Sequence, residues 1–555
     1  MSTEAAQCFD QLVESYYRAW FRFHPEAAVD AGVAGFEHLL RPYHDDEIGA
    51  LIALDEKLLA GLEEIDPASL DEDRALDYSV LQGATQIEHH ELLEFDWRRR
   101  DPGAFLPTHA IYQLTVRPVR DLPAAMKSRL ARVPDHLRGA RAQLKTLPEL
   151  VPVPWLEAAV AEAEAGATFL QRVDRHPQLS DAGSKSDLRR LQDAAARAML
   201  DFAKFLQDEI SPRAAGEFAV GDVHFERLLR YRHFLPVDAS QLSRFGERLF
   251  TETEEQLKAV TLHLRGDTDV AALTASIRAE HPTESSLLDV YRDEMRAAHR
   301  FLAQHDIVSL PAEEQLSVVA TPEFLRHQIP FAAYLDPAPN DSSQQGYYYV
   351  TPANSEVLLG EHNYAGIQHT CVHEAWPGHH LQFVTANRNP ASCSLPRLLN
   401  PSATLYEGWA LYCEQLMQEE GFLSRPEQRF ILLRDRLWRA LRVMLDVDIQ
   451  VRGVSLDQAA ERMSEALGFP HQQAMADLTW YCHSPAAPMG YATGWALINQ
   501  LRRRAIANDD DFDLRIFHDR LLGAGSVALP LVIQRQFGAA AWEQIRTVVE
   551  LQNTA

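Results

Sequence analysis

The sequence predicts a mainly α-helical protein that contains one small β-sheet. Apolar residues recur at helical spacing along most of the chain, whereas a single short region reads as a group of strands. No internal repeat, low-complexity tract or long linker interrupts the 555 residues. This organisation favours one large body, long enough to form two lobes, over an array of independent modules.

Apolar stripes identify the individual helices. The first stripe is 9–20, where six apolar or aromatic side chains recur every three or four residues, and the second is 188–206. Pro123 and Pro154 suit the first turn of a helix, whereas Pro134 is expected to break or kink the helix around it. Further helices are expected at 123–146, 154–172, 240–263, 286–304, 427–450 and 491–506.

The predicted sheet lies between residues 314 and 351. Three short candidate strands, 315–320, 329–334 and 346–350, are separated by segments rich in turn-forming residues. The composition also changes near 305–315. We therefore expect an N-terminal helical lobe at 1–310 and a second lobe at 311–555 that carries the sheet, the two being intertwined in one fold.

The composition restricts the partners of the protein. Its 53 Lys and Arg residues against 79 Asp and Glu residues give a formal net charge of −26. Nucleic acids and anionic membrane surfaces are bound through clustered basic side chains, so we expect neither as a partner. The expected partner is a small peptide substrate. The sequence carries no signal for an oligomeric state.

The first twenty residues do not combine a basic segment with an apolar core as a signal peptide does, and no apolar run reaches the roughly 20 residues of a membrane-spanning helix. The five cysteines are an odd number without a CxxC pair. A disulfide framework is therefore not expected, and these observations predict a reducing, cytoplasmic location.

Residues 369–382 read HTCVHEAWPGHHLQ and concentrate four histidines beside one glutamate. In the zinc-hydrolase pattern HExxH, two histidines four residues apart share a helical face and bind Zn²⁺, and the intervening glutamate reaches the metal-bound water. His373 and Glu374 begin this pattern, but Pro377 stands where the second histidine should be. The motif is therefore a variant that needs a local distortion.

Three histidines compete for the second ligand position. A bulge at Pro377 and Gly378 would bring His379 to the place of the second HExxH histidine, and we favour His373 with His379. On an unbroken helix His380 would share the face of His373, but seven residues span roughly 10 Å, too far for one metal ion. His369 is four residues before His373 and forms the remaining alternative pair.

A third ligand is expected from a carboxylate on another helix, with the fourth position left open for water. Glu407 in TLYEGWALYCEQL is our candidate, because the 28 residues after His379 allow one helix to end and another to pack against it. Glu414 lies on the same helical face and is the alternative ligand, or a carboxylate that orients a ligating imidazole.

Four strings, HEAWPGHHLQ, EGWALYCE, YATG and FHDRLLGAGSVAL, resemble the bacterial domain-of-unknown-function family eight-eight-five. That family is similar to the mainly helical gluzincin zinc peptidases, such as the thimet oligopeptidase and Taq carboxypeptidase families. The resemblance implies a two-lobed helical body around a deep groove, with a small sheet at the groove edge. It also implies zinc bound by His373, His379 and Glu407, with Glu374 as general base and Tyr491 as oxyanion donor.

The sequence therefore predicts a zinc-dependent metallopeptidase that hydrolyses short or unfolded peptides. A zinc hydrolase of a non-peptide amide or ester and a catalytically vestigial helical binding protein are the alternatives. An extended substrate is expected to pair with the edge of the strand at 346–350, and His483 is a candidate to assist Tyr491. The candidates for binding a terminal carboxylate are Arg326, Arg442, Arg502 and His518.

Overall fold

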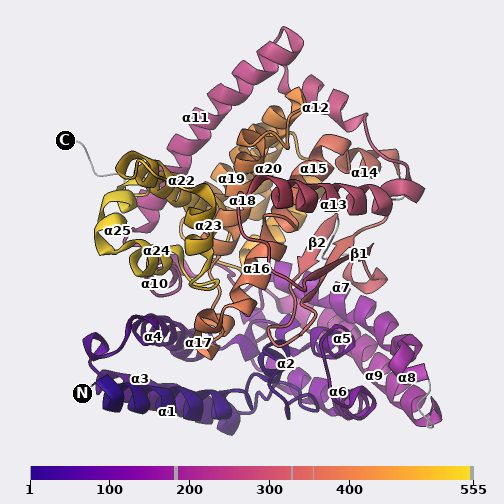
Figure 1. The fold of residues 1–555 in the computed structure, drawn as a ribbon. Helices are drawn as coiled ribbons and strands as arrows, with labels where there is room; N and C mark the ends of the chain where they lie inside the picture. Colours follow the sequence, from indigo (N-terminus) through magenta and orange to yellow (C-terminus); the bar gives the residue numbers. More distant parts are fainter. Residues whose placement is uncertain (1, 181–184, 327–328, 330, 354, 551–555) are drawn as a thin grey trace. The chain divides into compact units, whose positions relative to one another are not determined.

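The protein is described by a computed structural model that covers residues 2–550 except 181–184, 327–328, 330 and 354 (Figure 1). Its regular structure is almost entirely helical and includes one three-stranded sheet. The prediction of a mainly α protein with a small sheet is therefore confirmed. None of the described helices has both the length and the apolar character needed to cross a membrane.

The chain divides into two compact units. The first consists of Met1–Phe218 with two short later segments, Pro322–Gln328 and Ala338–Asp341, and the second contains the rest of the chain. This division lies about ninety residues before the predicted boundary at 310/311. The reason is that α11 (Ala239–Arg265), which the sequence assigned to the first lobe, packs along α19 (Pro426–Gln450) of the second unit.

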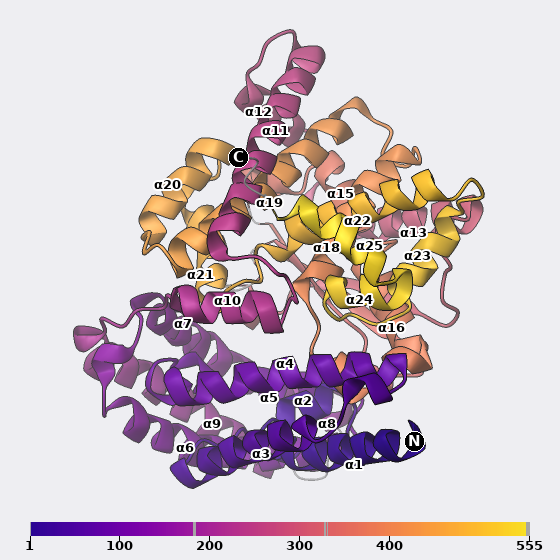
Figure 2. The ribbon, with the colours of Figure 1, turned by 90° about the vertical axis from the view of Figure 1, so that its left-hand side faces the viewer.

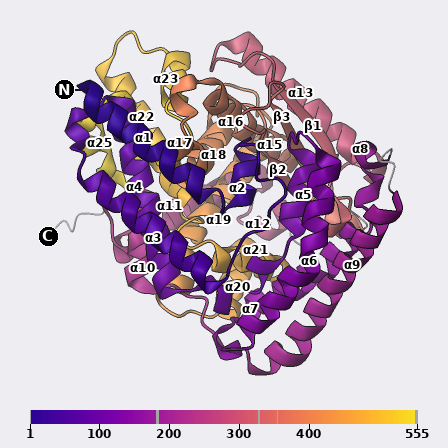
Figure 3. The same ribbon diagram turned by 90° about the horizontal axis from the view of Figure 1, so that it is seen from below.

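The first unit is helical. Its long helices α1, α3 and α4 lie side by side (Figure 2). A separate group consists of α6, α7 and α9 (Figure 3). Buried leucine, alanine and phenylalanine side chains of these helices form a core. The helices of this unit are α1 Ser2–Trp20, α2 Pro25–Asp30, α3 Asp45–Glu63, α4 Glu72–Glu94, α5 Thr108–Val116, α6 Leu122–Leu144, α7 Val153–Leu170, α8 Pro177–Ser180 and α9 Lys185–Phe205.

Pro134 was expected to break or kink its helix, and it does not break it. α6 continues through Pro134 to Leu144, and Pro123 occupies the first turn as predicted. Leu130, Val133 and Leu137 on either side of Pro134 are almost fully buried in the core of the unit. Packing of this apolar face offsets the loss of one backbone hydrogen bond.

The second unit contains the remaining helices and the sheet. α18 and α22 pack closely against each other, and α15 packs against both α13 and α18. These contacts gather the segments that carry the predicted site. The helices not yet given are α10 Gly221–Tyr231, α12 Val270–Arg278, α13 Leu287–His305, α14 Glu356–Glu361, α15 Tyr364–Glu374, α16 His379–Arg388, α17 Leu395–Leu399, α18 Ala403–Glu419, α20 Leu456–Leu467, α21 His471–His483, α22 Gly490–Asn508, α23 Leu514–Leu522, α24 Leu529–Phe537 and α25 Ala539–Ile545.

The sheet has the strand order β1-β3-β2. β1 (Gln315–Ala320) has the predicted bounds and pairs in parallel with β3 (Gln345–Val350), so that Gln315 lies opposite Gln345. β2 (Ala332–Leu335) begins three residues later than predicted and pairs antiparallel with β3. Since β3 is the central strand, the expectation that a substrate adds to its edge is wrong, and β2 provides an outer edge instead.

Candidate metal centre

The helix that begins the histidine motif is interrupted at the predicted place. α15 ends at Glu374, and α16 begins at His379 after a turn that contains Pro377 and Gly378. A Cβ atom on Gly378 would lie 1.8 Å from the carbonyl oxygen of His373, so only glycine fits this turn. The distortion is a break between two helices rather than a bulge within one helix.

A side chain of α18 stabilises this turn. The indole nitrogen of Trp409, a fully buried residue, donates a hydrogen bond of 2.8 Å to the Pro377 carbonyl oxygen. The Gly378 amide donates to the Val372 carbonyl oxygen at 3.0 Å. These two hydrogen bonds fix the Pro377 carbonyl group and the Gly378 amide. They therefore fix the direction of α16 and the position of His379 at its start.

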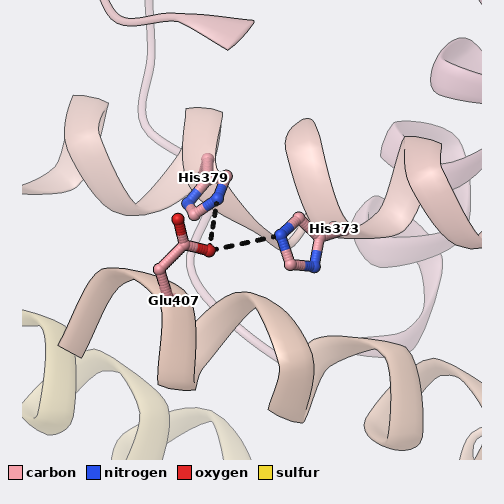
Figure 4. A group of neighbouring side chains, drawn as sticks. All are labelled: His373, His379 and Glu407. Carbon is pink, nitrogen blue, oxygen red and sulfur yellow. Dashed lines mark ion pairs between the residues drawn. The ribbon is translucent and has the colours of Figure 1, made fainter. Parts of the chain in front are cut away.

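The structure brings His373, His379 and Glu407 together (Figure 4). Glu407 Oε2 lies 3.4 Å from His373 Nε2 and 3.3 Å from His379 Nε2. Three donor atoms, one from each side chain, lie within 4.8 Å of one another. All three residues come from the ends or sides of helices that pack together, two from the broken motif and one from α18.

These distances suit a zinc ion. Donors bonded to tetrahedral zinc at 2.0–2.1 Å are separated from one another by roughly 3.3 Å, and two imidazoles with one glutamate form a known catalytic ligand set. Glu407 Oε2, the atom that faces both imidazoles, is buried and has no hydrogen-bond partner among the described residues. Buried polar atoms are normally satisfied, so this lack of a partner is consistent with a metal ligand set.

Glu414 orients one of these imidazoles. Its Oε1 atom accepts a hydrogen bond of 2.8 Å from His373 Nδ1, which leaves Nε2 of His373 directed at Glu407. Carboxylates that accept from the second nitrogen of a ligating histidine fix its tautomer and ring orientation. This contact matches the second of the two roles that the sequence allowed for Glu414, that of a carboxylate that orients an imidazole.

The two competing histidines point elsewhere. His369 Nε2 donates to the Gln428 carbonyl oxygen at 3.0 Å. His380 is fully buried, with Nε2 2.7 Å from Glu314 Oε2 and Nδ1 2.9 Å from the Tyr334 hydroxyl. Both nitrogens of His380 therefore have partners on the protein, and His379 is the histidine that lies with His373 and Glu407.

The charges in this cluster are strongly coupled. Burial alone would raise the pKa of Glu407, but His379 and His373 outweigh it and hold that pKa well below its usual value. Burial alone would lower the pKa of His373, yet the neighbouring carboxylates of Glu407 and Glu414 raise it to about 10. Burial raises the pKa of Glu374. Dense negative charge around the two imidazoles is the environment that a divalent cation requires.

Glu374 and Tyr491 line the same cavity, whose volume is ≈ 340 Å³. Glu374 makes no hydrogen bond or ion pair with any residue that the structure describes, so its carboxylate is available to a ligand. The ring of Tyr491 lies parallel to that of His373 with centroids 6.2 Å apart. Burial and the Glu407 carboxylate raise the pKa of Tyr491 far above its usual value, which keeps its hydroxyl a hydrogen-bond donor.

Two glycines explain how Tyr491 reaches the cluster. A Cβ atom on Gly408 of α18 would lie 2.5 Å from the Cα atom of Gly494 of α22, so the two helices cross with their backbones in contact. Glu407 and Tyr491 lie beside this crossing. The small residues in EGWALYCE and YATG are therefore needed for close helix packing, and they place a phenol next to the candidate ligands.

Some predicted residues lie outside the cluster. His483 is exposed at the end of α21, where its Nδ1 atom bonds to the Thr479 carbonyl oxygen, so its suggested help to Tyr491 is not supported. His518 is buried between Tyr412 and Ile307. Arg502 pairs with Glu419, and Arg326 belongs to the first unit. Of the four candidates for a terminal carboxylate, Arg442 is the one that lines the cavity.

The cavity wall that α19 provides was not predicted from the sequence. Arg434, Trp438 and Arg439 line the cavity together with Arg442. Their spacing of three or four residues was a readable signal, because it places them on one helical face.

Comparison with known proteins gives a family and a fold. The sequence profile of the family described as bacterial protein of unknown function (DUF885) matches residues 25–535. No curated protein matches the chain.

Two solved structures are similar over nearly their whole length. One is described as "a putative lipoprotein of unknown function from Shewanella oneidensis", with a TM-score of 0.77 and 22% identity over 95% of this chain and 99% of that chain. The other is "the putative lipoprotein from Colwellia psychrerythraea", with a TM-score of 0.79 and 17% identity over 98% of this chain and 99% of that one. At these identities the likeness establishes the shared fold, and the printed descriptions give no support to the predicted cytoplasmic location.

Proposed function

The chain belongs to the bacterial family of unknown function DUF885, and we propose that this member is a zinc-dependent hydrolase that cleaves short or unfolded peptides. The observation that carries the proposal is the convergence of His373, His379 and Glu407, with Glu407 Oε2 3.3–3.4 Å from both imidazoles. The resemblance of the sequence motifs to those of gluzincin peptidases favours the same reaction.

His373, His379 and Glu407 would hold the zinc ion, which when bound would polarise a water molecule and the scissile carbonyl group. Glu374 lines the cavity without a protein partner, and its carboxylate would accept the proton of the attacking water and deliver it to the leaving amine. Tyr491 would donate a hydrogen bond to the carbonyl oxygen as negative charge develops there. Glu414 would hold the His373 ring in place.

The position of β2 next to the cavity favours an extended substrate. Phe331 and Ala332, at the start of β2, line the cavity, and β2 ends the strand order of the described sheet. Backbone groups on such an edge bind extended peptides through main-chain hydrogen bonds. This observation favours a peptide over a small ester or non-peptide amide as the substrate.

The proposal is tested by measuring zinc and turnover on the same purified protein. We expect one zinc ion per chain by elemental analysis, and hydrolysis of peptides in a mixture that also contains small esters and amides. Glu374→Gln should retain zinc and lose at least about a hundredfold in kcat, since general-base catalysis contributes 10²–10⁴-fold. Glu419→Gln on α18, whose carboxylate pairs with Arg502 away from the cavity, is the matched control.

Two results would contradict the proposal. Absence of stoichiometric zinc from protein that is folded and supplied with zinc would favour a binding protein. Full activity of the Glu374→Gln variant would remove the proposed base from the reaction. Cleavage of esters or non-peptide amides with no cleavage of any peptide would keep the zinc chemistry and replace the substrate class.

A further inference from the structure

One face of α19 forms a wall of the cavity beside the candidate metal centre. Arg434, Trp438 and Arg442 follow one another at intervals of four residues and therefore lie in one row along the helix. Ile431, Asp435 and Arg439 line the cavity from the neighbouring row. Three guanidinium groups thus face a cavity in which a substrate would lie.

Two of these three guanidinium groups have acidic partners. Arg442 Nη2 lies 3.1 Å from Asp477 Oδ1, and Arg439 Nη1 lies 3.6 Å from Asp435 Oδ1. A fourth arginine of the lining, Arg278 on α12, pairs with Glu361 at 2.7 Å. The positive charge that these groups bring to the cavity is therefore balanced within the protein.

Arg434 is different, because it makes no hydrogen bond or ion pair with any residue that the structure describes. Its Nε and Nη2 atoms are buried and unpartnered, and its guanidinium carbon lies 5.5 Å from the centroid of the Phe469 ring. The nearby charges are mixed: Asp435 and Glu361 are acidic, and Arg278 and Arg439 carry like charge. A buried guanidinium is normally paired, since loss of hydration without a partner is costly, and a planar carboxylate is its best match.

The distance between Arg434 and the candidate metal centre indicates which part of a substrate would carry this carboxylate. Arg442 contacts Tyr491, with its guanidinium carbon 4.6 Å from the ring centroid, and so marks the end of the row near the metal centre. Arg434 is eight residues earlier on α19, roughly 12 Å along the helix axis. An extended peptide covers about 3.3 Å per residue, so this span corresponds to about three or four residues.

We propose that Arg434 binds a carboxylate of the substrate, a few residues away from the bond that is hydrolysed. This inference rests on the proposed function and specifies its substrate class: short peptides that carry a carboxylate at that position. The carboxylate can be the free C-terminus or an acidic side chain. Each would form the same charge-assisted, bidentate contact with the guanidinium group.

The test compares peptides that differ only in this charge. A set of short peptides with neutral side chains is prepared as free acids and as C-terminal amides, and the amides are also prepared with one Asp at each position. We expect kcat/KM to be about tenfold or more higher for a carboxylate-bearing peptide than for the neutral amide, because a charge-assisted pair is stronger than a neutral one. The preferred set identifies the C-terminus or the side chain as the source.

Arg434→Gln should abolish this preference by raising KM for the carboxylate-bearing peptide, with kcat and the zinc content little changed. Arg434→Lys should restore part of it. Arg429→Gln is the matched control, because Arg429 is also half-buried on α19 but lies outside the cavity and bonds to Gln418. A melting temperature close to that of the unmodified protein establishes that each variant is folded.

Failure of this inference differs from failure of the proposed function. Equal kcat/KM for acids and amides, or a preference that survives in Arg434→Gln, would overturn the carboxylate site and leave the peptidase intact. The same peptides are also titrated calorimetrically into zinc-loaded Glu374→Gln protein, which reports binding without turnover. Binding that shows no dependence on the carboxylate, including no binding of either form, would overturn the inference as well, and lack of zinc or of any hydrolysis would be the separate failure of the proposed function.

Discussion

The Nδ1 atom of His373 lies 2.8 Å from Glu414 Oε1, and this contact determines which nitrogen of the imidazole faces the candidate metal centre. Burial would raise the pKa of Glu414, but the neighbouring imidazoles of His369 and His373 hold it well below its usual value, so the carboxylate is ionised and can only accept. His373 Nδ1 must therefore carry the hydrogen. Its Nε2 atom, 3.4 Å from Glu407 Oε2, is the nitrogen left for a metal ion.

We predict that Glu414→Ala lowers zinc affinity by about 10–100-fold, the usual effect of removing a group that orients a ligating histidine. Glu414→Gln should lower zinc affinity less, because the amide oxygen of the new side chain can still accept a hydrogen bond from His373 Nδ1. Competition with a chromophoric chelator measures both affinities. Equal affinity in Glu414→Ala and the unmodified protein would show that the carboxylate does not position the ligand.

Substitution of Gly378 should damage the site more than substitution of an ordinary glycine. In Gly378→Ala the new methyl group would lie 1.8 Å from the His373 carbonyl oxygen, so the turn before His379 must move. We expect loss of stoichiometric zinc and a loss of stability of roughly 3 kcal/mol or more, measured by chemical denaturation. Gly49→Ala is the control: it lies within α3 with no atom near the added Cβ, and should be neutral or stabilise by up to ~1 kcal/mol.

Tyr491→Phe should lower kcat by about 10²–10³-fold, since removal of one oxyanion donor has this effect, and should leave KM and zinc content nearly unchanged. The ring stays in place because Phe keeps the contacts with His373 and Arg442. Steady-state kinetics with a cleaved peptide provide the measurement. A variant that loses affinity for substrate at constant kcat would assign Tyr491 to substrate binding instead.

His518 should make the protein less stable in acid. Its Nδ1 donates to the Ile307 carbonyl oxygen and its Nε2 accepts from the Tyr412 hydroxyl, both at 2.8 Å, so the folded state holds the neutral ring. Burial lowers the pKa of His518 from 6.5 to about 3.

Between these two pH values the unfolded chain binds a proton that the folded chain does not. Stability contributed by the neutral ring is therefore present above about pH 6.5 and decreases as the pH falls, by up to ~1.4 kcal/mol per pH unit. Unfolding free energies of the unmodified protein and of His518→Gln, measured from pH 7 to pH 4, should show the smaller slope in the variant. Identical slopes would contradict a buried neutral histidine.

The sequence predicted the helices and the broken motif well, because both depend on local rules. Apolar stripes gave the first helix and α9, and the inability of Pro377 to continue a helix indicated the break that separates Glu374 from His379. The strands were predicted almost as well, and β1 has the predicted bounds. Their order was not predicted, because the pairing of three short strands depends on the packing around them.

Long-range contacts explain the remaining differences. The packing of α11 along α19 moved the division between the units to Phe218, and no local signal in residues 219–310 records that contact. Neither Arg434 nor Arg439 was singled out from the sequence. Their importance appears once α19 is seen to be buried on nearly all sides, so that its arginines line a cavity rather than face solvent.

The hydrogen bond from Trp409 to the Pro377 carbonyl oxygen has a consequence for protein engineering. α18 supplies Glu407 and, two residues later, the indole that holds the turn before His379. A peptide that copies residues 369–382 alone would lack both and should not chelate zinc in the same arrangement. Transfer of this centre to another scaffold would therefore require α15, α16 and α18 together.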